Sequence, residues 1–150
     1  MEKNLGFYHL EGDSLLTVEM RRKISEDEPF MLEEFSAYIR SIIAQVYLLK
    51  KSYSKIVISQ GLFLQQHRDL IANAFPDDEL NFFQINASEG VLDARVQARF
   101  DRGESKVTPG YAKMIAEIFE KMGAAYQIDN SQDHNDAHLL LQLRSIRKGW

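Results

Sequence analysis

Apolar positions along the chain recur with two periods, which predict alternating strands and helices. Short apolar runs at 6–10, 55–59, 81–87 and 125–129 are bounded by polar or turn residues, as strands are. Between them, steps of three and four predict helices. The strongest helical stripe consists of Leu32, Phe35, Ile39, Ile42, Val46 and Leu49. Further helices are expected over about 63–74, after Ser88, from Thr108 to Gly123, and from about Asn135 to Arg147.

The run Ile56-Val57-Ile58 is continuous and β-branched, which is typical of a strand buried in a parallel sheet. Strands that alternate with helices indicate an α/β fold. The sequence therefore predicts one domain over 1–150, with a parallel sheet of about four strands and helices on both faces. Side chains expected to face inward are Leu92, Val96 and Phe100 in the helix after Ser88, and Leu139, Leu143 and Ile146 in the last helix.

Composition and charge exclude only a few classes of partner and site. A net charge of −4 gives no general attraction to nucleic acid or to an anionic membrane. The absence of cysteine excludes disulfides and thiolate metal sites. No run reaches the roughly 18 apolar residues of a membrane span, and no signal peptide is apparent. We therefore expect a cytoplasmic protein without nucleic-acid or membrane partners.

Candidate chemistry follows the first two strands, because ligands of open α/β sheets bind outside the carboxyl ends of strands. Glu11 and Asp13 follow the first strand and would point the same way along an extended segment. They could hold magnesium or take a proton from a hydroxyl, or form a solvated turn. Gln60 and Gly61 follow the second strand.

Basic residues offer a second set of candidates. Arg95, Arg99 and Arg102 recur at helical spacing, so they either bind phosphates or form a solvated face that pairs with Asp93 and Asp101. Arg68 could grip an anionic substrate or pair with Asp69. The triplet at 21–23 and the acidic run at 26–28 are expected on the solvated surface.

The histidines carry little predicted chemistry. His67 is expected on a helix surface. His134 and His138, with Asp133 and Asp136 nearby, have a spacing that would suit a metal, but a polar cap at the start of the last helix is the simpler interpretation. No metal ligand is therefore assigned.

Several segments, in order, resemble the gluconate and shikimate kinase group of P-loop kinases. Ser59-Gln-Gly-Leu-Phe-Leu-Gln-Gln-His-Arg-Asp-Leu-Ile71 is similar to the group's serine-rich turn and its helix with an arginine–aspartate pair. His9-Leu-Glu-Gly-Asp13 resembles the acidic motif after the second strand, with Glu11 where an aspartate is usual. Leu92-Asp-Ala-Arg-Val-Gln-Ala-Arg99 resembles the helix leading into the lid, and Tyr126 to Asp129 the last strand.

The sequence departs from the group at the phosphate loop. None of the eight glycines is followed by Lys-Ser or Lys-Thr, the ending of the loop that cradles phosphates. Relative to the family, the chain is expected to lack the first strand and this loop. The resemblance places that strand between 55–59 and 81–87. We therefore expect these two strands to pair directly, or another chain to cover the gap, as in a homo-oligomer.

The resemblance implies ATP- and Mg-dependent phosphoryl transfer to a hydroxyl of a small, anionic metabolite. It implies that Asp13, with Glu11, is catalytic and that Gln60, Gly61 and Arg68 line the acceptor site. It also implies that Arg95, Arg99 and Arg102 approach the nucleotide phosphates. The alternative is a non-catalytic binding or assembly protein that keeps the kinase fold, since phosphoryl transfer depends on positioning by the phosphate loop.

Overall fold

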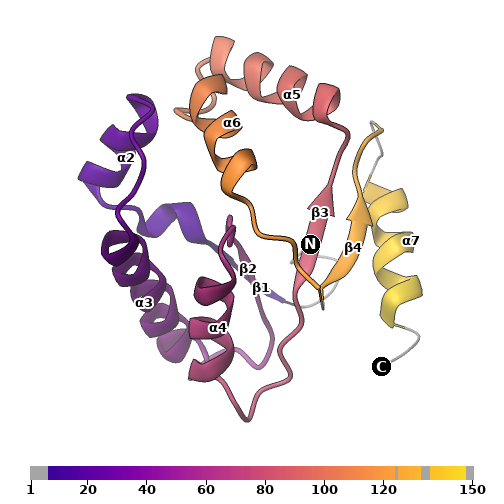
Figure 1. Cartoon of the computed structure of the whole chain (residues 1–150). Helices are drawn as coiled ribbons and strands as arrows, with labels where there is room; N and C mark the ends of the chain where they lie inside the picture. The colour runs from indigo at the N-terminus through magenta and orange to yellow at the C-terminus, as the bar shows by residue number, and fades with distance from the viewer. Residues whose placement is uncertain (1–6, 124, 133–135, 148–150) are drawn as a thin grey trace.

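Short strands alternate with helices in the computed structural model, which describes residues 7–123, 125–132 and 136–147 (Figure 1). In chain order the elements are β1 (Tyr8–Glu11), the 3-10 helix η1 (Gly12–Leu15), α2 (Val18–Ser25), α3 (Leu32–Leu49), β2 (Ile56–Ser59), α4 (Gln65–Ala74), β3 (Phe83–Asn86), α5 (Glu89–Asp101), α6 (Pro109–Ile118), β4 (Tyr126–Asp129) and α7 (Asp136–Arg147).

The strands form two parallel pairs rather than one sheet. β1 pairs with β2 so that Glu11 lies opposite Ser59, and β3 pairs with β4 so that Asn86 lies opposite Asp129. Among the described residues, β2 and β3 are not hydrogen-bonded to each other. The predicted α/β class and parallel strand direction are confirmed. The predicted single sheet of about four strands is not found, and the direct pairing of 55–59 with 81–87 is wrong.

The core is built around α3, whose predicted apolar stripe is largely confirmed. Phe35, Ile39, Ile42 and Val46 are buried, whereas Leu32 at the start of the helix is exposed. Leu10 of β1 and Ile71 of α4 belong to the same buried cluster. This core holds the carboxyl ends of β1 and β2 at a fixed distance from α3 and α4.

Helix α5 lies apart from this core, at the top of Figure 1, whereas α6 packs against the core through Ile115. The expectation that Leu92 and Phe100 face inward is wrong, since they are 47% and 41% exposed. The reason is that α5 contacts chiefly α6, which covers little of its surface. Helix α6 begins as predicted, with Thr108 accepting a hydrogen bond from the Tyr111 N–H and Pro109 in its first turn, but it ends at Ile118 rather than Gly123.

At the opposite side of the molecule, α7 packs against β4 (Figure 1). Leu143 and Ile146 of α7 are half-buried. The side chain of Leu139 and the predicted helix start at Asn135 lie outside what the structure describes. None of the helices among the described residues has the length and apolarity needed to cross a bilayer.

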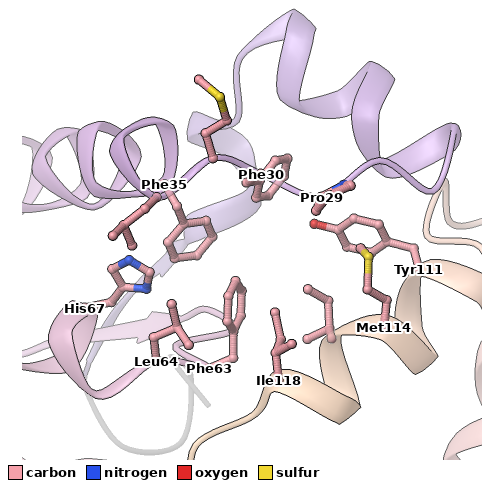
Figure 2. A pocket seen from close by; sticks show the side chains of 12 residues that line it. Pro29, Phe30, Phe35, Phe63, Leu64, His67, Tyr111, Met114 and Ile118 are labelled. Atoms are coloured by element: carbon pink, nitrogen blue, oxygen red, sulfur yellow. The ribbon is translucent and has the colours of Figure 1, made fainter.

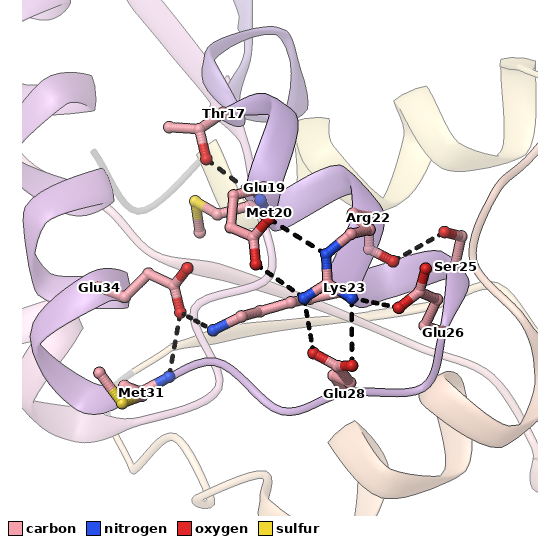
Figure 3. Close-up of polar contacts among 10 residues, drawn as sticks. All are labelled: Thr17, Glu19, Met20, Arg22, Lys23, Ser25, Glu26, Glu28, Met31 and Glu34. Atoms are coloured by element: carbon pink, nitrogen blue, oxygen red, sulfur yellow. Dashed lines mark hydrogen bonds and ion pairs between the residues drawn. The ribbon is translucent and has the colours of Figure 1, made fainter.

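Helix α2 carries charged residues that pair with one another instead of standing free in solvent (Figure 3). Arg22 binds Glu19 and Glu28 at 2.7 and 2.8 Å and also contacts Glu26. Lys23 reaches Glu34 of α3 at 2.8 Å. The Arg22 pairs are exposed, so they add little to stability. The pair that links α2 to α3 is that of Lys23 with Glu34.

The loop between α2 and α3 also holds the start of α6. Asp27 adopts a left-handed backbone conformation, with φ of 56°. Its carboxylate accepts a hydrogen bond from the Thr108 hydroxyl and lies against Gly110 so closely that a β-carbon there would overlap it. A side chain at position 110 would therefore separate the two segments.

Candidate polar site at the carboxyl ends of β1 and β2

The parallel register of β1 and β2 brings together the polar residues that follow each strand. Gly12 is buried against the side chain of Gln60. The Tyr38 hydroxyl donates a hydrogen bond of 2.7 Å to the Gln60 amide oxygen. One residue earlier, the His9 ring and the Ser59 hydroxyl are hydrogen-bonded at 2.7 Å. Gln60 is thus held by groups from η1 and α3 and has a fixed position at the sheet edge.

Asp13 carries the carboxylate with the strongest electrostatic influence on this site. Partial burial raises its pKa, and the negative charge of Glu11 raises it further, while Arg21 and Arg99 oppose the shift. Arg21 also donates a hydrogen bond of 2.7 Å to the Asp13 carbonyl oxygen. A carboxylate with a raised pKa is a better proton acceptor near neutral pH than an ordinary aspartate.

The charge of Asp13 also acts on two tyrosines, Tyr38 of α3 and Tyr111 of α6. Burial raises the pKa of Tyr38, and the charge of Asp13 adds to the effect. Burial likewise raises the pKa of Tyr111 to about 12, with contributions from Asp13 and Glu34. Both phenols are therefore neutral at physiological pH. The Tyr38 proton is already donated to Gln60, so Tyr111 is the one of the two that can donate a hydrogen bond to a ligand oxygen.

The three candidate arginines of α5 do not act as one row. Arg95 donates to the carbonyl oxygens of Asn130 and Gln132 at 2.7 and 3.2 Å, beyond β4. Arg102 binds Glu104 at 2.7 Å. Arg99 is the member of the stripe whose charge acts on Asp13. The alternative of pairing with Asp93 and Asp101 is also not what the structure has, because the observed partners of Arg95 and Arg102 lie elsewhere.

Arg68 is buried, and its guanidinium group binds backbone carbonyl oxygens instead of facing the polar site. It is 2% exposed, and its guanidinium donates to the carbonyl oxygens of Leu62 and Glu120 at 2.5 and 3.1 Å. Asp69 does not serve as its partner and accepts from Gln65 instead. Gly61 is exposed with open space around it. Of the predicted acceptor-site residues, Gln60 is the one that the structure brings next to Asp13.

His67 is buried, so its predicted position on a helix surface is wrong. It is 0% exposed, and neither ring nitrogen has a hydrogen-bond partner. Its ring packs against Phe35 and Phe63 at centroid distances of 4.4 and 6.0 Å. Burial lowers its pKa; Arg68 acts in the same direction, and Glu120 opposes. An unpaired buried polar group costs roughly 1–3 kcal/mol of stability. The presence of histidine at position 67 is therefore not explained by packing alone.

The sequence reasoning missed Arg21 and the two tyrosines. Arg21 stands in a basic triplet that reads as solvated surface, yet Arg22 and Lys23 turn to carboxylates while Arg21 turns to Asp13. Tyr38 falls three residues after Phe35 on the apolar face of α3, so helical spacing could have placed it inward, though not beside Gln60. His134 and Asp133 lie outside the described residues, so the suggested metal cluster is not placed.

The donor set fits magnesium better than it fits a nucleotide. Glu11 and Asp13 are neighbouring carboxylates whose mutual repulsion a divalent cation would relieve, and Mg²⁺ prefers one or two carboxylates with water and phosphate oxygens. No group of three metal-ligating side chains occurs in the part of the chain that the structure describes. For triphosphate, Arg99 is the one of the three predicted arginines whose charge acts on Asp13.

Comparisons with known proteins establish the fold. The structure is similar to that of a gluconokinase from Sinorhizobium meliloti, with a TM-score of 0.73, 20% identity, and coverage of 99% of this chain and 83% of that chain. It is also similar to a sugar kinase from a Janibacter species, with a TM-score of 0.76, 14% identity, and coverage of 98% and 83%. No family model and no curated protein sequence matches the chain. The fold is therefore that of a small-molecule kinase.

Proposed function

We propose that the chain is a small-molecule kinase whose polar site binds a small, hydroxylated, anionic metabolite of the sugar-acid type. The observation that carries this proposal is Asp13, a carboxylate with a raised pKa next to the charge of Arg99, at a strand end of a kinase fold. Arg21 and Arg99 supply positive charge for an anionic ligand. Gln60, Tyr38 and Tyr111 supply neutral polar groups suited to hydroxyls.

In this proposal Asp13 acts as the general base. Its carboxylate accepts the proton of the acceptor hydroxyl as that oxygen forms its bond to phosphorus. Glu11 and Asp13 together hold Mg²⁺, and Arg99 neutralises charge that develops on the transferred group. ATP, when bound, supplies the phosphoryl group and leaves as ADP. Arg95 and Arg102 have no part, because both guanidinium groups are engaged elsewhere.

The proposal is tested by comparing the wild type with Asp13→Asn, using D-gluconate, ATP and Mg²⁺. We expect gluconate-dependent ADP formation that falls by roughly 10²–10⁴-fold in Asp13→Asn, as for loss of a general base. Asp93→Asn is the matched control, since Asp93 is an exposed aspartate of α5. Absence of ADP formation in the wild type across a panel of sugar acids would reject the kinase assignment.

The second candidate function is a binding or assembly protein that keeps the kinase fold without turnover. It is favoured by the engagement of Arg95 and Arg102 away from the site and by the lack of any Gly-Lys-Ser/Thr sequence within the 150 residues. Isothermal titration separates the two. Gluconate affinity that is retained without ADP formation supports the binding protein, whereas micromolar affinity for a magnesium–ATP analogue supports the kinase.

A homo-oligomer is part of the same proposal. Within the described chain β2 has a strand partner on one edge only, and Ile85 in the middle of β3 is 60% exposed. A strand edge or an exposed apolar strand position is stabilised when another chain covers it. Chromatography with light scattering tests this, and a monomer at all concentrations would remove the oligomer from the proposal.

A further inference from the structure

A small apolar pocket lies between the start of α3, the start of α4 and one face of α6 (Figure 2). Its volume is about 130 Å³, and its walls include Phe35, Phe63, Tyr111 and Ile115. In Figure 2 the ring of His67 stands at one end of the pocket, and Tyr111 and Met114 stand at the other. The walls therefore come from elements on both sides of the molecule's centre, and a ligand there would contact α4 and α6 at once.

His67 gives this pocket a buried polar group without a hydrogen-bond partner. The side chain lines the pocket, is 0% exposed, and makes no hydrogen bond through Nδ1 or Nε2. Phe35 and Phe63 pack against its ring and offer it no acceptor or donor oxygen. Buried polar groups in native proteins are nearly always paired with protein, water or ligand. The hydrogen-bonding capacity of the His67 ring nitrogens is therefore best satisfied by a polar group of a ligand that enters the pocket.

Size and chemistry restrict what that group is. An apolar cavity of about 150 Å³ accommodates benzene, so this pocket admits one six-membered ring or a branched chain of similar size. Neutral imidazole has one donor and one acceptor nitrogen, and a hydroxyl matches it in either role. The aromatic walls favour a ring, because aromatic groups pack edge to face or offset. A multiply charged sugar phosphate does not suit these walls.

We propose that this pocket binds a neutral monocyclic molecule with a single hydroxyl, of the phenol class, whose ring lies between Phe35, Phe63 and Ile115 and whose hydroxyl is hydrogen-bonded to His67. The site adjoins the polar site but shares neither Asp13 nor Gln60 with it. It is independent of the kinase assignment, since its occupant needs no phosphate, metal or acceptor hydroxyl. By contacting both α4 and α6, the ligand joins the core to the helix that follows Arg99.

The test uses phenol and benzene as probes on the full chain, with ligand-observed and histidine-ring NMR. We expect saturable one-to-one binding of phenol at millimolar concentrations and a shift of the His67 ring signals. His67→Phe should weaken phenol binding roughly tenfold or more, to the level of benzene, since it removes the hydrogen bond and keeps the ring. Benzene binding should change little in this variant.

Ile115→Phe should abolish binding of both probes, because the added ring fills the pocket. Val18→Phe is the matched control, since Val18 is 87% exposed on α2. If Ile115→Phe does not fold, Met114→Phe adds volume from the adjacent wall residue, and the shift of the wild-type His67 signals needs no variant. Equal affinity for phenol and benzene, an unshifted His67, or phenol binding that persists when the pocket is filled would each overturn the proposal.

Discussion

The side chain of Gln60 packs against Gly12 so closely that a β-carbon at position 12 would overlap its amide group. This contact joins the carboxyl end of β1 to that of β2. It also orients the amide oxygen that accepts the Tyr38 hydroxyl. The position of Gln60 in the polar site is therefore determined by the absence of a side chain at residue 12.

We predict that Gly12→Ala displaces Gln60 and breaks its hydrogen bond with Tyr38. Overpacking of this kind costs about 1–3 kcal/mol, which urea unfolding measures directly. Gly61→Ala is the matched control, because nothing lies within 4 Å of the β-carbon that it would add. That variant should be as stable as the wild type. Equal unfolding midpoints for the two variants would show that Gln60 yields at no cost.

Arg68 should matter for stability and not for substrate recognition. In Arg68→Met the carbonyl oxygens of Leu62 and Glu120 lose their donor, and we expect the free energy of unfolding to fall by about 3 kcal/mol. Arg102→Met removes an exposed pair with Glu104 and should leave the free energy of unfolding nearly unchanged. A gluconate affinity that collapses while stability is unchanged would instead assign Arg68 to the acceptor site.

Acid should destabilise the fold through His67. Because the pKa of His67 in the folded protein lies below the usual histidine value of 6.5, the unfolded chain takes up the proton first as the pH falls. Stability from this group is present above pH 6.5 and is lost as the pH falls toward the folded pKa, with a slope of up to about 1.4 kcal/mol per pH unit.

Unfolding of His67→Phe between pH 8 and 5 should therefore show a flatter dependence than the wild type. Gly61→Ala, which removes no titratable group and adds a β-carbon into open space, should leave the slope unaltered. Parallel curves for the wild type and His67→Phe would mean that His67 is protonated equally in both states.

The pKa of Asp13 should respond to Arg99. Partial burial and Glu11 raise this pKa, and Arg99 is one of the two arginines that hold it down. Arg99→Gln should raise it further, as measured by carboxyl carbon NMR, and should move the acid limb of any Asp13-dependent activity to higher pH. Arg102→Gln, whose guanidinium faces Glu104, should have no such effect. An unchanged Asp13 titration in Arg99→Gln would separate α5 from the polar site.

Hydrogen exchange should reveal the uncovered edge of β2. Tyr8 donates to the Lys55 carbonyl oxygen, so alternate residues, Val57 among them, turn their backbone groups toward β1. The amides of Ile56 and Ile58 point to the other edge and should exchange faster than that of Val57. Protection of Ile56 and Ile58 that grows with protein concentration would indicate a second chain on that edge; uniform slow exchange in a monomer would contradict the described pairing.

The strands and α3 could be predicted because each has one continuous buried face. The apolar residues of such a face recur with a regular spacing that is visible within a single segment of the sequence. Helix α5 has the same kind of stripe, yet Leu92 and Phe100 are exposed, since a stripe does not reveal whether another element lies opposite. His67 was misplaced for the converse reason. Its burial is produced by Phe35 and Phe63, and Phe35 belongs to a different helix.

Within the polar site, the order of motifs along the chain located Asp13, Gln60 and Arg99, whose positions follow from strand ends and one helix. It could not separate Arg99 from Arg95, because helical spacing places both on nearly the same face. The distinction arises from distant carbonyl groups at Asn130 and Gln132 that bind Arg95. The direction in which a long side chain points is thus determined by residues that are distant in the sequence and close in the fold.

The contact of Asp27 with Thr108 joins residues 81 positions apart in the sequence. Since Thr108 caps α6 and Tyr111 follows within one turn, the loop at Asp27 sets where Tyr111 stands. Tyr111 in turn lines the apolar pocket, and the charge of Asp13 contributes to its raised pKa. Substitutions at Asp27 should therefore alter both ligand environments together, although Asp27 itself does not line the apolar pocket.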